Sequence, residues 1–138
     1  MNKILKNILA LVAGFLLGSA VNMGLIMISG SVIPPPAGVD NSTMEGLKEG
    51  MHLFEVKHFI FPFLAHACGT FVGAFLVYLI AGSHQLKFAL AIGCFFLLGG
   101  LINVFMLPTP LWFAIVDILV AYIPMAWIAS LLAKRFSK

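Results

Sequence analysis

Four apolar blocks dominate the sequence, and each is long enough to cross a lipid bilayer as one helix. A transmembrane helix needs about 20 mostly apolar residues, and the blocks cover residues 4–29, 61–81, 86–107 and 110–133. Only 9% of all residues are charged, against about 25% in a soluble domain. The sequence therefore predicts an all-α membrane protein, a four-transmembrane-helix bundle that forms a single integral membrane domain over residues 1–138.

The positive charges lie at the ends of these blocks, and this placement predicts an orientation. If the spans alternate in direction, six of the eight basic residues share one side: Lys3, Lys6, Lys87, Lys134, Arg135 and Lys138. Basic residues accumulate on the cytoplasmic side of a membrane. We therefore expect both termini in the cytoplasm (N-in/C-in), the loop 30–60 outside, and a bacterial cytoplasmic membrane. The lipid bilayer is the expected partner. A nucleic-acid partner is not expected, because the basic residues form no exposed cluster with polar or aromatic readers.

The outer loop 30–60 has the pattern of a short helix. Ser42 and Glu45 have the spacing of a capping box, in which two side chains bind the free amides of a helix start. Apolar residues then recur at helical spacing, at Met44, Leu47, Met51 and Phe54. This predicts a short amphipathic helix on the membrane surface or on the bundle. The alternative is a loosely ordered loop, since Gly46 and Gly50 weaken a helix.

Small residues recur every fourth position in the first two blocks, as Ala10, Gly14 and Gly18 and as Ala65, Gly69 and Gly73. Such rows let two helix backbones approach closely in lipid. We expect the two rows to pack, on each other or in a homo-oligomer.

Each apolar block also contributes one polar side chain to what we predict is a common layer. The four residues are Asn22, His66, Asn103 and Asp117. At 1.5 Å per residue they lie about 6–10 Å below the outer end of their spans. Polar side chains are costly in hydrocarbon and usually face the bundle interior or a wet cavity. The pattern therefore predicts a polar pocket that opens to the outside.

Asp117 is the only acidic residue within a span, and His66 is its natural partner at this depth. Two interpretations remain open: a pair that binds a proton or cation, or a hydrogen-bonded pair that fixes the helix register. Thr70 lies one turn after His66, where it either lines the layer or bonds its own helix carbonyl. Pro124 predicts a kink below Asp117.

A metal site is an alternative for part of this set. Glu55 and His58 have the Glu-x-x-His spacing of some helix-bundle metal sites, and a helix through the loop would place both near the mouth of the pocket. With His66 and Asp117 they offer the ligands for a single divalent metal. A lone Glu-x-x-His is a weak signal, so no cofactor is assigned.

Three functions compete. The first is a small membrane protein that binds an ion or small polar ligand in an outward-facing intramembrane pocket, with transport or proton coupling as an extension. Its predicted ligand-binding residues are His66, Asp117, Asn22, Asn103, Glu55, His58 and Thr70. The second is a structural or accessory subunit of a membrane complex. The third, a metal-dependent membrane enzyme, is less favoured, and no catalytic residue is identified.

Overall fold

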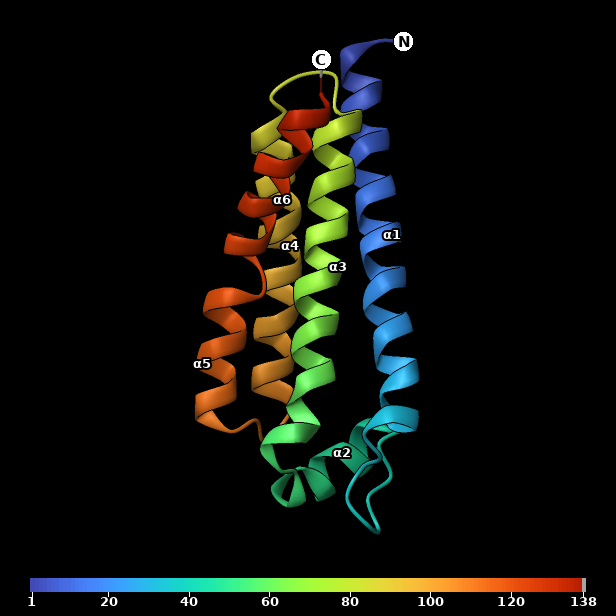
Figure 1. The fold of residues 1–138 in the computed structure, drawn as a ribbon, viewed down its shortest axis with the longest axis vertical. Coiled ribbons are helices and arrows are strands. Elements are labelled where there is room, and N and C mark those ends of the chain that lie inside the picture. Colours follow the sequence, from blue (N-terminus) through green and yellow to red (C-terminus); the bar gives the residue numbers. More distant parts are fainter. Residues whose placement is uncertain (138) are drawn as a thin grey trace.

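The computed structural model describes residues 1–137, and Lys138, counted above among the cytoplasmic charges, lies outside the described residues. The chain runs through helices joined by short connections and one longer loop (Figure 1). The elements are α1 (Lys3–Val32), α2 (Met44–Gly50), η1 (Met51–Leu53), η2 (Val56–Phe59), α3 (Ile60–Ile80), α4 (Gln85–Met106), α5 (Leu111–Val120) and α6 (Ile123–Phe136).

Within residues 1–137, four helical spans are long and apolar enough to cross a membrane. They are α1, α3 with the preceding η2, α4, and α5 together with α6. This confirms the predicted class, an all-helical protein with four segments long and apolar enough to span a membrane. The helices follow the apolar blocks closely, and the largest shifts lie at the ends of α1 and α6, at residues 32 and 136 instead of 29 and 133.

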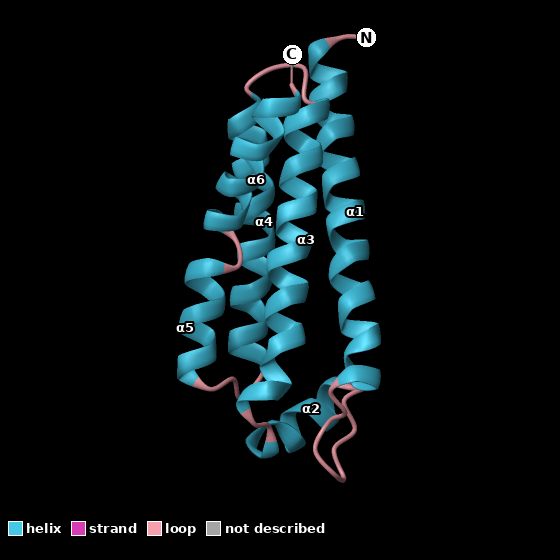
Figure 2. Cartoon of the chain, viewed as in Figure 1, coloured by secondary structure: helices cyan, strands magenta, loops and turns pink. Residues whose placement is uncertain are grey.

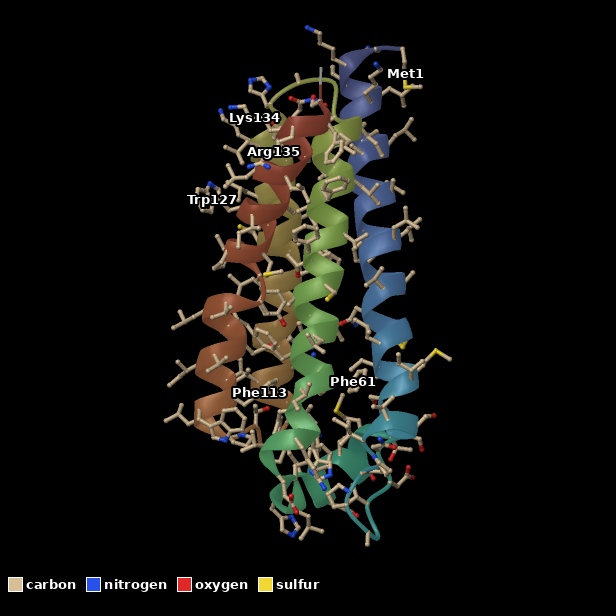
Figure 3. All side chains as sticks on the ribbon, in the orientation of Figure 1. Met1, Phe61, Phe113, Trp127, Lys134 and Arg135 are labelled. Atoms are coloured by element: carbon tan, nitrogen blue, oxygen red, sulfur yellow. The ribbon has the colours of Figure 1, made fainter. Side chains whose placement is uncertain are left out.

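Helix α3 occupies the centre of the bundle and packs against α1, α4 and α6 (Figure 1). Both described chain ends and the turn between α3 and α4 lie at one end, which we call the terminal end. Helix α2 and the loop around it lie at the other, the loop end. The side chains of Met1, Lys134 and Arg135 gather at the terminal end (Figure 3). Lys134 and Arg135 therefore give the terminal end positive charge.

Glycines bring α1 and α3 into backbone contact. A Cβ atom added to Gly18 would lie 2.7 Å from the carbonyl oxygen of Gly69. One added to Gly73 would lie 2.8 Å from the carbonyl oxygen of Gly14. Both small-residue rows are thus buried against each other within one chain, which is the packing of small residues expected for helices in lipid.

Asn7 ties the start of α1 to the turn between α3 and α4. Its Oδ1 accepts hydrogen bonds from the backbone N–H groups of Gly82 (2.9 Å) and Ser83 (3.2 Å), and its Nδ2 donates to Ser83 Oγ (3.0 Å). We expect Asn7→Ala to lower the free energy of unfolding by about 1–3 kcal/mol, because two turn amides lose their acceptor. Unfolding by SDS in mixed micelles measures this. Asn2→Ala, which removes one helix N-cap bond, should cost about 1 kcal/mol. If Asn7→Ala and Asn2→Ala lowered the free energy of unfolding equally, the hydrogen bonds from Asn7 to the α3–α4 turn would not stabilise the bundle as proposed.

The fourth span is broken in its middle (Figure 2). Helix α5 ends at Val120 and α6 begins at Ile123, with Pro124 as its second residue. Proline has no N–H to donate to the carbonyl four residues earlier, so a continuous helix loses a bond there. The interruption therefore lies where Pro124 predicts a kink. Ala121 caps the end of α5 and Tyr122 caps the start of α6.

The loop helix differs from the expectation in start and length. Its N-cap is Thr43 rather than Ser42, because the N–H and the Oγ of Ser42 both donate to Asp40. These bonds, the side-chain one first, lower the pKa of the Asp40 carboxyl. Helix α2 stops at Gly50 instead of continuing to His58, and the chain goes on as short 3₁₀ turns. A Cβ at Gly50 would lie 2.5 Å from Val39, so the preceding loop folds across this point.

Candidate functional site

Asp117 and His66 form a direct contact inside the bundle. Asp117 lies in the last turn of α5 with 3% of its surface exposed, and His66 lies in the second turn of α3. The Nδ1 atom of His66 is 2.9 Å from each carboxylate oxygen of Asp117. An ionised carboxylate only accepts hydrogen bonds, so we assign the ring proton to Nδ1. The other ring nitrogen, Nε2, then has a free lone pair.

Tyr122 completes this buried cluster. Its hydroxyl donates to Oδ2 of Asp117 over 3.2 Å, and its ring stacks on that of His66 with centroids 5.8 Å apart. The tyrosine is 2% exposed. A Cβ at Gly100 would lie 2.6–2.8 Å from ring atoms of Tyr122 and would also meet its hydroxyl, so α4 provides the space that the phenol occupies. The carboxylate therefore receives donors from two sides, which is what a buried charge requires.

A cavity of about 290 Å³ is lined in part by His66. Polar residues from three helices line it, Asn22 of α1, His66 and Thr70 of α3, and Asn103 of α4. The remaining wall consists of Phe96, Tyr122 and the glycines Gly69, Gly99 and Gly100. Asn22 is half-buried while Asn103 and Gly99 are exposed, so the cavity opens on the α4 side. Asp117 contributes no lining atom and contacts the cavity only through its two partners.

Thr70 has an unsatisfied hydroxyl. The residue is 1% exposed, and its Oγ1 finds no hydrogen-bond partner among residues 1–137. The common alternative for a helical threonine, a bond to its own helix carbonyl, is not made. Since Thr70 lines the cavity, a bound molecule or water there is the partner that its hydroxyl can reach.

Glu55 and His58 belong to a different place. They cap each other at the start of η2, where the Glu55 N–H donates to His58 Nδ1 over 2.8 Å. The Nε2 atom of His58 lies 3.1 Å from the carbonyl oxygen of Pro34. His58 also lines a separate cavity of about 130 Å³ at the loop end, below α1. Both ring nitrogens are engaged in shaping the loop.

The four-residue metal set is consequently not assembled. Within the described part of the chain, no group of three or more His, Cys, Asp or Glu side chains converges as metal ligands. The physical reason is the early end of α2 at Gly50. The loop then turns instead of extending as one helix, and His58 is held by Pro34 and Glu55 rather than near His66.

Sequence reasoning missed Tyr122, which we expected only to pack or to anchor the bundle. It follows Asp117 by five residues, a spacing that does not place two side chains together on a regular helix. The break between α5 and α6 gives Tyr122 a non-helical backbone (φ −114°, ψ −82°) and turns its hydroxyl back to Asp117. Pro124 was the available signal, because it marked where the helix would be interrupted.

Comparisons of this chain with protein families, curated proteins and solved structures gave no match. Fold and site together define the class as a helical membrane bundle with a buried Asp–His–Tyr cluster beside a polar cavity. The function has to be argued from that site alone.

Proposed function

We propose that this chain is a membrane protein that binds a small polar ligand in the cavity beside His66. The ring of His66 accepts a hydrogen bond from that ligand. The observation that carries this proposal is the division of the His66 ring between two environments. Nδ1 contacts Asp117 at 2.9 Å. Nε2 has no hydrogen-bond partner among the described residues, and the residue His66 lines the cavity.

This arrangement has a definite chemistry. Because Nδ1–H is donated to the carboxylate, Nε2 keeps its lone pair and acts as a hydrogen-bond acceptor. The site can therefore accept a hydrogen bond from a hydroxyl or N–H of a ligand. The amides of Asn22 and Asn103 offer both donors and acceptors at the cavity wall.

The orientation belongs to the same proposal. The terminal end carries Lys3, Lys6, Lys87, Lys134 and Arg135, whereas the loop end carries two lysines among four acidic residues. By the positive-inside rule the terminal end faces the cytoplasm of a bacterial cell and the cavity opens toward the outer leaflet. Transport or proton coupling would require movement of this small bundle, and a homo-oligomer would use faces other than the buried α1–α3 contact.

Cysteine accessibility tests the cavity directly. A membrane-impermeant methanethiosulfonate reacts only with a thiol that water reaches, because the thiolate is the nucleophile. In a background with Cys68 and Cys94 replaced by alanine, we expect Asn103→Cys to react from outside intact cells. The matched control is Met23→Cys, at the depth of Asn22 on a lipid-facing surface of α1 (55% exposed). It should stay unlabelled.

Each result separates the competing functions. If Asn103→Cys and Asn22→Cys are as unreactive as the Met23 control from both sides, the core is dry and the structural or accessory subunit is favoured. If they react only in inverted vesicles, the orientation is wrong. A metal-dependent enzyme would instead need a ligand set that the described residues do not bring together.

A further inference from the structure

The lining of the cavity restricts the charge of its ligand. Among the described residues, no Asp, Glu, Lys or Arg side chain lines the cavity, and the carboxylate of Asp117 lies behind His66 and Tyr122, which both donate to it. An ion placed there would lose its hydration without gaining a counter-charge, which costs several kcal/mol or more. A hydroxyl of an uncharged head group can donate to Nε2 of His66, and a carbonyl oxygen can accept from the Thr70 hydroxyl or from the two amides. The cavity is therefore suited to a neutral polar group.

Its size and aromatic wall suit a ring. A cavity of about 150 Å³ accepts benzene, and this cavity is about 290 Å³. The larger volume leaves room for a six-membered ring that carries several substituents. Phe96, Tyr122 and the bare backbone of Gly99 form part of its lining. The unpartnered Oγ1 of Thr70 is an independent sign of a missing hydrogen-bonding group at the same wall.

A second, separate space lies along the same pair of helices. Toward the terminal end, α1 and α4 border a groove of about 420 Å³, lined by Leu11, Val12, Phe15, Leu16, Ala91, Ile92 and Phe95. Every one of these side chains is apolar. Phe15 lies near both spaces, since its ring centroid is 5.2 Å from that of Phe95 in the groove and 6.1 Å from that of Phe96 in the cavity. Helices α1 and α4 otherwise touch little, because each packs mainly on α3.

We propose that the seam between α1 and α4 binds an uncharged lipid-soluble amphiphile, with its hydrogen-bonding ring in the cavity and its hydrocarbon tail in the groove. Quinones and quinols have this chemistry. The order of the two spaces along the seam, polar then apolar, matches one molecule that has both parts. This inference rests on the proposed ligand site and names its ligand class; it predicts that the ligand arrives from the bilayer rather than from water.

The binding experiment uses tritiated decylbenzoquinone and the full chain in nanodiscs, with empty nanodiscs subtracted. Three competitors separate the parts of the ligand: methylbenzoquinone lacks the tail, 1-decanol lacks the ring, and decanoate carries a charge. We expect decylbenzoquinone to compete at least 10-fold better than each. Equal competition by methylbenzoquinone would overturn the role of the groove, and equal competition by 1-decanol would overturn the ring.

Matched variants assign the two parts to their spaces. Gly99→Leu fills the cavity, and a Cβ there meets no atom within 4 Å, so the backbone need not shift. Its control is Gly24→Leu on α1, which is equally open and outside the cavity. Ala91→Trp fills the groove, with exposed Ala20 replaced by tryptophan as control. We expect Gly99→Leu to weaken both quinones at least 10-fold, and Ala91→Trp to weaken only the decyl compound.

Thr70→Val adds a readout that a purely structural role would not give. Removing an unpartnered buried hydroxyl should raise the Tm of the ligand-free protein while it weakens decylbenzoquinone binding several-fold. A variant with raised Tm and unchanged binding would overturn the placement of the ring. If no quinone binds but Asn103→Cys is still labelled, the amphiphile is wrong and the polar cavity stands. If Asn103→Cys is also unlabelled, both proposals fail.

Discussion

Asp117→Ala is expected to lower the free energy of unfolding by about 2–4 kcal/mol, since it leaves a partly buried imidazole and a buried phenol without their common acceptor. Both partners lie against Asp117, His66 at 2.9 Å and Tyr122 at 3.2 Å. Tyr122→Phe, which removes one donor and leaves the pair intact, should cost about 1 kcal/mol. SDS unfolding in mixed micelles gives these values, with the exposed loop residue Glu49→Ala as a control that stays within about 0.5 kcal/mol.

The same substitution has a spectroscopic consequence at His66. With Asp117 present, we assign the proton of the neutral ring to Nδ1, which leaves Nε2 unprotonated. Without the carboxylate, nothing holds that tautomer, and Nε2–H forms become populated. Nitrogen-15 NMR of the labelled imidazole distinguishes the two. A wild-type protein already in the Nε2–H form, or an Asp117→Ala protein as stable as wild type, would contradict the buried cluster.

Gly69→Ala is the second substitution with a large expected effect. It should lower the free energy of unfolding, whereas Gly24→Ala on α1 should not. The new Cβ would lie 2.8 Å from the carbonyl oxygen of Gly18 and 3.0 Å from the Cβ of Asn22, both on α1. The two helices must separate, which we expect to cost about 1–3 kcal/mol. Gly24→Ala meets no atom within 4 Å. It should leave stability unchanged or raise it by up to about 1 kcal/mol through better helix propensity.

A double variant tests whether one helix displacement causes both effects. Gly18→Ala should cost as much as Gly69→Ala, because its Cβ would lie 2.7 Å from the carbonyl oxygen of Gly69. Once the helices have moved apart for the first methyl group, the second needs little more room. The combined loss should therefore fall below the sum of the single losses. Additive losses, or a destabilised Gly24→Ala, would show that the contact is not what limits these positions.

Much of the fold was readable because the bilayer imposes a simple requirement. A backbone in hydrocarbon must satisfy its hydrogen bonds internally, so each long apolar block becomes a helix. The break in the fourth span was also predictable, since Pro124 cannot donate a backbone hydrogen bond. The loop was read less well. Its apolar spacing is helical, but Ser42 donates hydrogen bonds to Asp40 instead of capping the helix. The α-helix also ends at Gly50.

For the candidate site, the sequence predicted how deep each polar residue lies along its helix, but not which neighbouring helix its side chain faces. Counting residues places Asn22, His66, Asn103 and Asp117 in one layer, and three of these line one cavity while the fourth binds His66. Depth depends only on the rise of a helix. Which side of a helix faces its neighbours depends on how all the helices pack, and the local spacing of Glu55 and His58 therefore misplaced them near this layer.

The sequence alone determined that this chain forms helices that cross a membrane, and it placed their polar residues along the membrane normal, because both follow from local composition and a fixed rise per residue. Only the tertiary structure decided that Tyr122 reaches Asp117 and that His66 lines a cavity. Those contacts depend on the interrupted fourth span and on the space left by Gly100, and each joins residues whose distance in the chain says nothing of their distance in space.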